Sequence, residues 1–267
     1  MLFSILLPTL GLRIKEIDRL ISSLNKQEFS DYEIVIVSQI NHQGIEELIK
    51  KWKHIKIKHI KLENKGLSLA RNAGIGVCDG EWIIFSDDDC WYPTNALKRL
   101  KDLIDKTNID VLLTQIYDPI KKKLYKPYQK KNMKIKTKIQ LMSKSSIEIA
   151  IRRSCIRCLF DEDFGLGARY VCGEEVDFLL NHLKGNVVSY VPVITVYHLK
   201  KEGNDNYKQI IAKGAIYAKH FNRLIGLIIV LRDFVLKHEK NWKLFWQGYN
   251  EMYMNRNRKH CFGKWRK

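Results

Sequence analysis

Three adjacent aspartates, Asp87, Asp88 and Asp89, follow the apolar segment Trp82–Phe85 after a single serine. An apolar run of this kind predicts a buried strand, so the three carboxylates are expected where that strand leaves the core. Unpaired charge is costly at a buried position, and carboxylate oxygens are the ligands that Mg²⁺ and Mn²⁺ prefer. A divalent cation bound there could in turn hold a diphosphate. The aspartate run therefore indicates chemistry on a nucleotide-linked substrate.

The composition and the charge distribution narrow the class of protein. The 267 residues are 45% hydrophobic and 28% charged, which is typical of a folded globular protein. The net charge of +18 is concentrated in two segments: residues 121–157 carry 13 Lys or Arg and one acid, and residues 256–267 carry six and none. Such segments favour an anionic partner, which includes nucleic acid, acidic lipid or a diphosphate. Solvated surface lysine is the alternative interpretation.

Several functional classes lack their sequence signatures. The chain has no P-loop pattern, no dinucleotide-binding glycine motif after a strand and no serine nucleophile elbow. The N-terminal apolar run is too short for a signal peptide, and Leu224–Leu231 is too short to span a bilayer. We therefore expect a cytoplasmic protein without a membrane-spanning segment.

Strand and helix patterns alternate around the aspartate run. Apolar runs predict strands at Phe3–Pro8, Tyr32–Val37, Ile55–Ile60, Glu81–Ser86, Asp110–Tyr117 and Ile147–Ile151. Helical periodicity predicts one helix between the first and second strands and another between the second and third. It also predicts helices at Ser68–Val77, Pro93–Asp105 and Glu174–Leu183. This order predicts an α/β fold with a mostly parallel sheet, in which ligands bind beyond the carboxyl ends of strands. We also expect paired strands at Val187–Tyr190 and Val193–Tyr197, and a mobile basic excursion over residues 118–145.

Three further motifs accompany the aspartate run in a fixed order. They are Leu7-Pro8-Thr9, the segment Lys65–Gly74, and the acidic stretch Phe160–Gly165 with Gly173–Phe178. Together with Asp87–Pro93, they resemble the family 2 glycosyltransferases of GT-A fold, of the bacterial surface-polysaccharide type. The resemblance covers about residues 1–200. It implies inverting transfer of a sugar from a nucleotide diphospho-sugar donor to a hydroxyl acceptor.

The resemblance also implies roles for individual residues. Members of the family use D-x-D carboxylates to bind a cation that bridges the diphosphate, here Mn²⁺ or Mg²⁺, and an acidic residue near the acceptor as the base. It implies Glu175 as the base with Glu174 beside it, and Trp91 and Asp177 as acceptor contacts. The implied metal ligands are Asp89, Asp87 and His198. The implied donor contacts are Pro8, Thr9, Ser38, Lys65, Arg71, Asp87 and Asp88.

These roles have structural alternatives. The aspartate run suits a turn or a helix cap, and two glutamates suit a first helical turn, where the helix dipole favours acids. Packing roles are the alternatives for Arg71, Trp91 and His198. Counted back from Pro93, the first aspartate of the family motif aligns with Ser86, so the choice among the carboxylates stays open.

Two segments depart from the family pattern. Ser38-Gln39 stands where members usually carry an aspartate pair that reads the base, so uridine is only the default nucleoside. Leu10–Arg13 replaces the usual first loop. A non-catalytic nucleotide-sugar binder is therefore one alternative. A basic nucleic-acid-binding protein is a weaker one, because it does not account for the acidic clusters, and we expect no nucleic-acid partner.

We divide the chain into a catalytic domain, residues 1–205, and a C-terminal helical extension, residues 206–267. The catalytic domain comprises a nucleotide-sugar half, residues 1–118, and an acceptor half, residues 119–205. In the extension, apolar residues from Phe221 to Val235 recur at helical spacing, and aromatic residues and the basic tail follow. This pattern suits attachment to the inner, anionic face of a membrane, where a glycan or lipid-diphosphate-linked acceptor would be available. A helix packed on the catalytic domain is the alternative.

Overall fold

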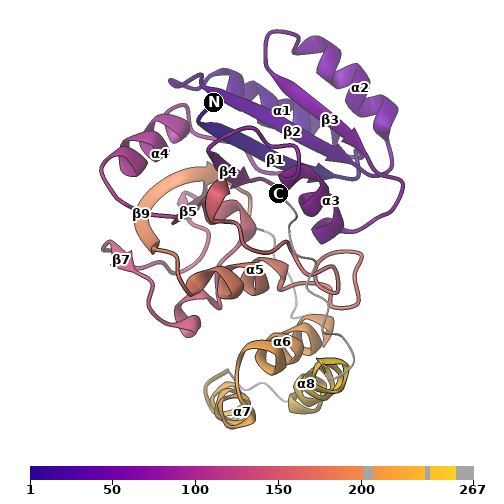
Figure 1. Ribbon diagram of the computed structural model, residues 1–267, viewed down its shortest axis with the longest axis vertical. Coiled ribbons are helices and arrows are strands. Elements are labelled where there is room, and N and C mark those ends of the chain that lie inside the picture. The colour runs from indigo at the N-terminus through magenta and orange to yellow at the C-terminus, as the bar shows by residue number, and fades with distance from the viewer. Residues whose placement is uncertain (201–206, 238–240, 257–267) are drawn as a thin grey trace.

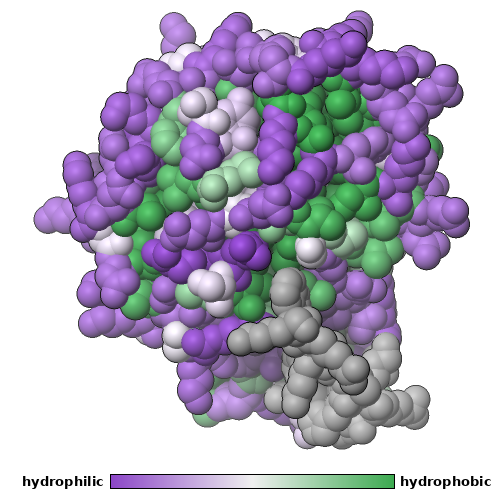
Figure 2. Space-filling view, turned by 45° about the horizontal axis from the view of Figure 1, so that its top comes forward, coloured by the Kyte–Doolittle hydropathy of each residue, from purple (hydrophilic) through white to green (hydrophobic). Residues whose placement is uncertain are grey.

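The computed structural model describes residues 1–200, 207–237 and 241–256. One sheet with helices on both faces occupies the first 200 residues, and three helices of the C-terminal segment lie beside it (Figure 1). Polar and charged residues dominate much of the outer face drawn in Figure 2. The strands are β1 (Phe3–Thr9), β2 (Tyr32–Ser38), β3 (Ile57–Lys61), β4 (Trp82–Phe85), β5 (Val111–Asp118), β6 (Lys123–Leu124), β7 (Met133–Lys134), β8 (Ile149–Arg152) and β9 (Val188–Tyr197).

The helices cover the sheet in two layers. The α-helices are α1 (Ile14–Asn25), α2 (His42–Lys51), α3 (Leu67–Ile75), α4 (Ala96–Asp105), α5 (Glu174–Leu183), α6 (Tyr207–His220), α7 (Arg223–Lys237) and α8 (Trp242–Arg256). Apolar side chains of α1, α2 and α4 form one core with one face of the sheet. Those of α3, α5, α6 and α8 form a second core, which includes the opposite face. The stripe Ile17, Leu20, Ile21 and Leu24 shows why α1 forms, since its apolar positions recur at helical period and all are buried.

The strand order is β3-β2-β1-β4-β8-β5-β9-β7, with β6 beside β5. β1, β2, β3 and β4 pair in parallel, and so do β5 and β9, whereas β8 runs antiparallel between β4 and β5. All seven residues of β1 are buried, as expected for a parallel strand covered on both faces. The predicted α/β fold with a mostly parallel sheet is confirmed. Its β1, β2 and β4 end together at one edge.

The segment predicted as two paired strands is one strand, β9, and that prediction is wrong. β9 pairs with β5 on both sides of Pro192, with Leu113 opposite Tyr190 and Gln115 opposite Ile194. The register shift between these two pairs absorbs the extra residues around Pro192. A proline has no N–H for the ladder, so a bulge is where a strand tolerates one.

The basic segment predicted to be a mobile excursion is anchored to the sheet. Glu148, which lies just after this segment, is 1% exposed and forms ion pairs with Lys126 and Lys144. The Tyr128 hydroxyl donates a hydrogen bond to Glu148 Oε1 at 2.9 Å. A buried carboxylate requires such partners, so this one acid draws the lysine-rich segment onto the body of the protein.

Helices α6 and α8 pack closely along each other. A Cβ on Gly214 would lie 2.0 Å from the carbonyl oxygen of Phe245, and one on Gly248 would lie 1.9 Å from that of Ile211. Only glycine permits this approach of the two backbones. Within the described residues, no helix combines the length and apolar character needed to cross a membrane. Most of the basic tail, residues 257–267, lies outside the described residues.

Candidate active site

The candidate site lies where β1, β2 and β4 reach their carboxyl ends. Thr9 ends β1 and pairs in register with Ser38, the last residue of β2. β4 leads through Ser86 into the run Asp87–Asp89. Thr9 Oγ1 donates a hydrogen bond to Asp88 Oδ2 at 2.8 Å and accepts one from the N–H of Gly11 at 2.9 Å. The first loop and the aspartate run therefore form one surface at the sheet edge.

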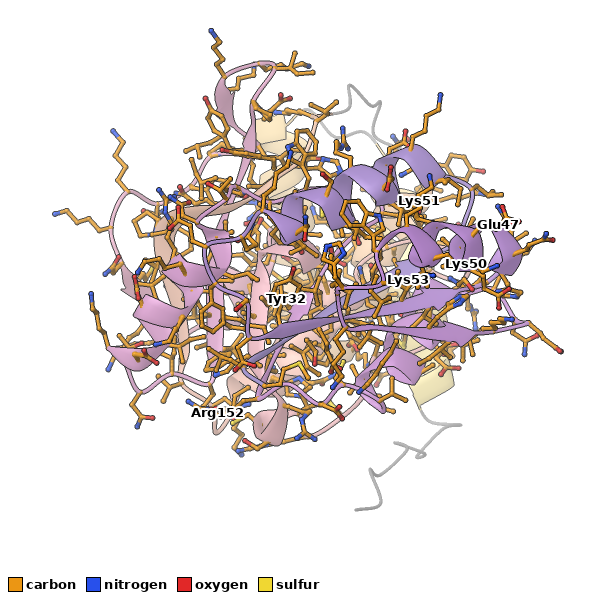
Figure 3. All side chains as sticks on the ribbon, turned by 90° about the horizontal axis from the view of Figure 1, so that it is seen from above. Tyr32, Glu47, Lys50, Lys51, Lys53 and Arg152 are labelled. Carbon is orange, nitrogen blue, oxygen red and sulfur yellow. The ribbon has the colours of Figure 1, made fainter. Side chains whose placement is uncertain are left out.

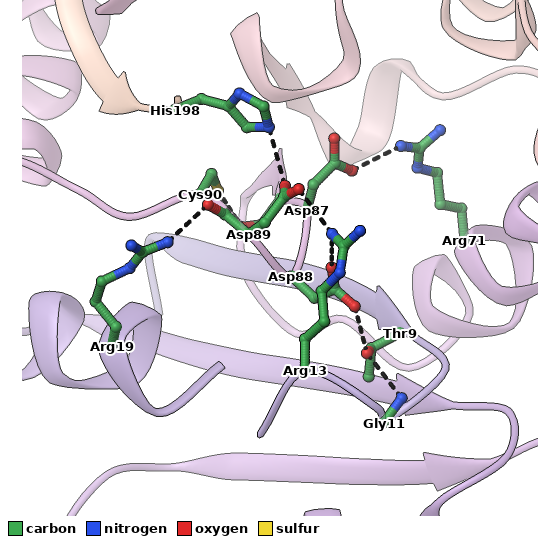
Figure 4. Close-up of polar contacts among 11 residues, drawn as sticks. Thr9, Gly11, Arg13, Arg19, Arg71, Asp87, Asp88, Asp89, Cys90 and His198 are labelled. Atoms are coloured by element: carbon green, nitrogen blue, oxygen red, sulfur yellow. Dashed lines mark hydrogen bonds and ion pairs between the residues drawn. The ribbon is translucent and has the colours of Figure 1, made fainter. Parts of the chain in front are cut away.

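Arg13 holds two of the three aspartates together. Its Nη1 donates to Asp88 Oδ1 at 3.0 Å and to Asp89 Oδ2 at 2.7 Å (Figure 4). The Arg13 side chain is 47% exposed, whereas those of Asp88 and Asp89 are 17% exposed. Its guanidinium thus offsets part of the negative charge of two partly buried carboxylates from a position open to solvent.

Asp89 and His198 fit a hard divalent cation. Asp89 Oδ1 lies 2.9 Å from Nε2 of His198, which follows β9. Adjacent ligands of an octahedral ion at about 2.1 Å lie about 3 Å apart, so both atoms could contact one Mg²⁺ or Mn²⁺. Across residues 1–200, 207–237 and 241–256, no group of three or more His, Cys, Asp or Glu side chains is arranged for a metal. Two protein ligands suit an ion whose remaining positions are filled by substrate phosphate and water.

Arg71 of α3 joins Asp87 to the acidic pair of α5. Arg71 Nη2 donates to Asp87 Oδ1 at 3.2 Å, and Arg71 Nη1 donates to Glu174 Oε1 at 2.9 Å. The side chains of Arg71 and Glu174 are 1% and 8% exposed. Their charges are compensated within the protein, because water has little access to them. Asp87 is therefore directed to Arg71, on a different side of the run from the Asp89–His198 pair.

Helix α3 also fixes the loop that precedes α5. Ser68 Oγ donates to the carbonyl of Phe164 at 2.6 Å. Asn72 exchanges two hydrogen bonds with the backbone of Phe160, at 2.8 and 3.0 Å. The segments Lys65–Gly74 and Phe160–Gly165 are thus two halves of one packed unit, which places Arg71 against Glu174.

Glu175 is a carboxyl group whose pKa is raised by its surroundings. It lies in the first turn of α5, beside Glu174. Burial, together with the negative charge of Glu174, raises the pKa of Glu175 well above that of an ordinary glutamate. A carboxylate with a raised pKa accepts a proton more readily. The turn begins after Gly173, whose φ of +95° is left-handed and whose added Cβ would lie 3.1 Å from Ile216 of α6.

Asp177 lies where an acceptor cannot reach it in this structure. It is 0% exposed, and Oδ1 accepts from His220 Nε2 at 2.6 Å. Lys219 Nζ lies 2.9 Å from Oδ2 and 2.7 Å from Asp161 Oδ2. Burial alone would raise the pKa of Asp177, but the His220 hydrogen bond and the Lys219 charge hold it below its usual range. Asp177 ties α6 to the helix that carries Glu175, so it is a positioning residue and its expected acceptor contact is revised.

Substitution Asp177→Asn should loosen α6 from α5. Loss of the charged hydrogen bonds is expected to lower the free energy of unfolding by about 1.5–3 kcal/mol. The pKa of Asp177 is lower in the folded protein than in the unfolded chain. Its contribution to the free energy of unfolding is therefore fully present above the pKa of the unfolded chain, and it is lost as the pH falls through the pKa of the folded protein. Urea unfolding of both proteins across that acidic range measures the difference. Equal stability of the two proteins at neutral pH would contradict the assignment.

The other expected donor residues lie around the same edge but differ in their surroundings. Ser38 is buried, and its Oγ lies 2.6 Å from His42 Nδ1 and 2.7 Å from His59 Nε2. Pro8 is a buried residue within β1, and Lys65 is exposed just before α3. The hydroxyl of Ser38 is thus engaged by two histidines, whereas Lys65 remains accessible to a ligand.

Trp91 is half-buried beside the aspartate run. The Arg19 guanidinium lies 3.8 Å above its ring, and Tyr197 packs edge-on at 5.9 Å. Arg19 Nη2 also donates to the carbonyl of Asp89 at 2.9 Å. Neither Arg13 nor Arg19 was expected at the site. Arg13 could have been found from its place in the loop after β1, whereas the helical position of Arg19 carries no such signal.

Residues 4–162 match the family described as Glycosyl transferase family 2. The poly(ribitol-phosphate) beta-N-acetylglucosaminyltransferase TarS of Staphylococcus aureus is 28% identical over 121 residues, which are 43% of this chain and 21% of that protein. An uncharacterized glycosyltransferase of Haemophilus influenzae is 30% identical over 122 residues, 45% of this chain and 39% of the relative. The chain thus matches well under half of the length of either relative.

Solved structures show the same fold. A crystal structure of S. aureus TarS in complex with UDP aligns with a TM-score of 0.68 and 21% identity, over 91% of this chain and 75% of that one. The mannosyltransferase PcManGT of Pyrobaculum calidifontis, in complex with GDP-Man and Mn²⁺, aligns with a TM-score of 0.60 and 12% identity, over 97% and 76%. The expected GT-A fold is confirmed. Since the family match covers more than half of the sequence, the chain belongs to glycosyl transferase family 2.

Proposed function

We propose that this chain transfers a sugar from a nucleotide diphospho-sugar to a hydroxyl acceptor with inversion. The observation that carries the proposal is the double contact of buried Arg71 with Asp87 and Glu174. This contact joins the strand-end carboxylates to the helix turn that holds Glu175. Membership of the family and the names of the relatives support the same activity.

The donor diphosphate would lie against the first loop and the aspartate run. Asp89 and His198 would hold Mn²⁺ or Mg²⁺, with Asp87 near the nucleotide side of the run. When bound, the ion supplies positive charge that stabilises the departing diphosphate. Arg13 can turn from Asp88 and Asp89 toward the phosphates because its side chain is largely exposed. Thr9 and Lys65 border the same space.

Glu175 would act on the acceptor. Its carboxylate takes the proton from the acceptor hydroxyl as that oxygen forms a bond to the anomeric carbon of the sugar. The bond between this carbon and the diphosphate oxygen breaks, and its electron pair leaves with the nucleotide. A single displacement from the opposite face inverts the configuration. Glu174, paired with Arg71, lies beside Glu175, and its negative charge helps to raise the pKa of Glu175.

The proposed donor and acceptor classes are taken from the related proteins. The structures of TarS contain UDP or UDP-GlcNAc, and that of PcManGT contains GDP-Man with Mn²⁺. The acceptor would be a glycan or a lipid-diphosphate-linked glycan of a cell-surface polymer, reached in the cytoplasm. A non-catalytic nucleotide-sugar binder is the second candidate, because histidines surround the Ser38 hydroxyl where family members usually carry aspartates.

A thermal-shift screen tests donor binding. UDP-, GDP- and dTDP-sugars are each added with and without Mn²⁺. A ligand that binds only the folded state raises the melting temperature by mass action. One nucleotide sugar should give a clear shift that requires Mn²⁺. Absence of a shift with every pair would contradict the proposal, and a shift without any transfer to added acceptors would favour the non-catalytic binder.

The exposed face of α7 supports attachment to an anionic lipid surface. Apolar side chains follow one another at helical spacing along this face, and between 44% and 64% of each is exposed. They are Leu224, Leu227, Ile228, Leu231 and Val235. Exposed Arg223 and Arg232 flank them, which suits acidic headgroups around an inserted apolar face. We assign this face to the inner surface of the membrane, at which a lipid-linked acceptor is presented.

Substitution Ile228→Glu should weaken binding to phosphatidylglycerol vesicles about tenfold or more, since it puts a carboxylate on the inserted face. Vesicle sedimentation measures the bound fraction. Gln209→Glu makes the same change of charge at an exposed position of α6 and should leave vesicle binding nearly unchanged. An equal loss of vesicle binding in both variants would show that only the net charge of the protein matters. A wild-type dimer that Ile228→Glu dissociates, with no vesicle binding, would assign the face to a second copy instead.

A further inference from the structure

A cavity lies beside the segment that follows Asp89. It encloses about 600 Å³ between α1, residues 91–95, α4 and the strands β5 and β9. This volume is within the usual range for small-molecule sites. Its lining includes the cations Arg19, Lys26 and Arg99 and the aromatic residues Trp91, Tyr117 and Tyr197. No residue assigned above to the donor, the metal or the base lines it, and Trp91 is the residue expected to contact the acceptor.

The residues that line the cavity carry a net positive charge. Three cations, Arg19, Lys26 and Arg99, line the cavity, and none of the described lining residues is acidic. Arg99 gives one hydrogen bond, from Nη1 to the carbonyl of Ile194 at 3.2 Å, and its side chain is exposed. Arg19 Nε is buried without a hydrogen-bond partner. An arginine has five N–H donors, so both guanidinium groups retain donors for an anion.

Aromatic rings and neutral polar groups line the rest of the cavity. Trp91, Tyr117 and Tyr197 form a connected set, with ring centroids 5.9 and 6.1 Å apart. Ring faces beside hydroxyl and amide groups, here Thr94 and Asn95, suit the apolar and polar faces of a sugar or polyol. Aromatic rings together with three cations suit a saccharide that also carries negative charge.

We propose that this cavity binds a phosphate-bearing sugar or polyol unit of the acceptor, at a distance from the hydroxyl that reacts. The inference rests on the proposed transfer of sugar to a glycan. The phosphate would contact Arg19, Lys26 and Arg99, and the carbon skeleton would lie against Trp91. Such a phosphate has two sources: a phosphodiester of the glycan itself, or the diphosphate of a lipid carrier.

The cavity is separate from the donor position. Arg19 reaches the backbone carbonyl of Asp89, whereas the Asp89 carboxylate faces Arg13 and His198 (Figure 4). Arg71 approaches the aspartate run from the opposite side of the same view. An occupant of the cavity would therefore contact the backbone of the aspartate run through Arg19 without displacing the donor.

Calorimetric titration of the full chain, saturated with the nucleotide and Mn²⁺ found in the thermal-shift screen, tests this site. The probes are ribitol 5-phosphate and ribitol, and glucose 6-phosphate and glucose, so that each phosphate has a neutral counterpart. At least one phosphate should bind about tenfold more tightly than its counterpart. Lys26→Gln/Arg99→Gln should remove that preference. Lys15→Gln, on the same helix as Arg19 but outside the lining, should retain it.

The outcomes separate this inference from the function on which it depends. Three results would overturn the acceptor site: neither phosphate binds, a phosphate and its neutral counterpart bind equally, or the double variant keeps the preference. In each case the thermal shift with nucleotide would still support the donor site. A citronellyl diphosphate that competes with the bound sugar phosphate would identify the lipid carrier as the source. Lack of competition would identify the glycan phosphodiester.

Discussion

Glu175→Gln is expected to lower the rate of sugar transfer by about 10²–10⁴-fold while the donor still binds. The amide has nearly the same shape as the carboxylate but cannot take the acceptor proton. Because Arg71 donates its hydrogen bonds to Glu174 and Asp87, the substitution leaves the Asp87–Arg71–Glu174 linkage in place. Initial rates with radiolabelled donor, together with the nucleotide-induced thermal shift, separate catalysis from binding.

The pH dependence gives a second readout of the same substitution. Burial and the neighbouring Glu174 raise the pKa of Glu175, so the proton-accepting form is lost as the pH falls through a value above that of an ordinary glutamate. The wild-type rate should fall in that range, and the residual rate of Glu175→Gln should not. Glu47→Gln, a change on exposed α2, should keep both the rate and the profile. Unchanged turnover in Glu175→Gln would remove Glu175 from the role of base.

Arg71→Met should both destabilise the fold and abolish transfer. It leaves the carboxylate of Glu174, 8% exposed, without its cation, and frees Asp87 from its contact. Breaking one side of a buried ion pair lowers the free energy of unfolding by about 3–5 kcal/mol. Denaturant unfolding measures this loss. Arg71→Lys retains the charge but not the double contact, so it should recover part of the stability and little of the activity.

A surface ion pair provides the control for Arg71. Arg152 contacts Glu81, with side chains that are 27% and 52% exposed. Figure 3 shows Arg152 at the rim of the molecule, far from Lys50 of α2. Arg152→Met should lower the free energy of unfolding by less than about 1 kcal/mol. Equal losses for Arg71→Met and Arg152→Met would contradict the claim that the Arg71 linkage is a buried bridge.

The sequence indicated the elements whose pattern is local. Apolar runs predicted β1, β2 and β4 because strands buried on both faces need uninterrupted apolar residues. Their order predicted a shared carboxyl edge, and Thr9 does contact Asp88 there. The bulge of β9 around Pro192 was missed because both halves of that segment read as short strands, and a bulge depends on the partner strand.

Contacts between distant segments could not be predicted from the residues. The polar partners of Asp177, namely Lys219 and His220, are 42 and 43 residues away, on a helix whose packing against α5 depends on the tertiary fold. Glu148 gave no sign that it would be buried, since an isolated acid among lysines reads as a surface residue. Arg13 was visible only as a departure in the first loop, and its contact with Asp88 and Asp89 requires the fold.

Electron paramagnetic resonance of Mn²⁺ tests the central claim most directly. Free Mn²⁺ gives a six-line signal that weakens when the ion is bound. In the presence of the nucleotide that stabilises the protein, the wild type should reduce the signal well below that of Mn²⁺ with nucleotide alone, and Asp89→Asn should not. Equal reduction by the wild type and Asp89→Asn, or none by the wild type, would contradict a cation held between Asp89 and the diphosphate of the donor.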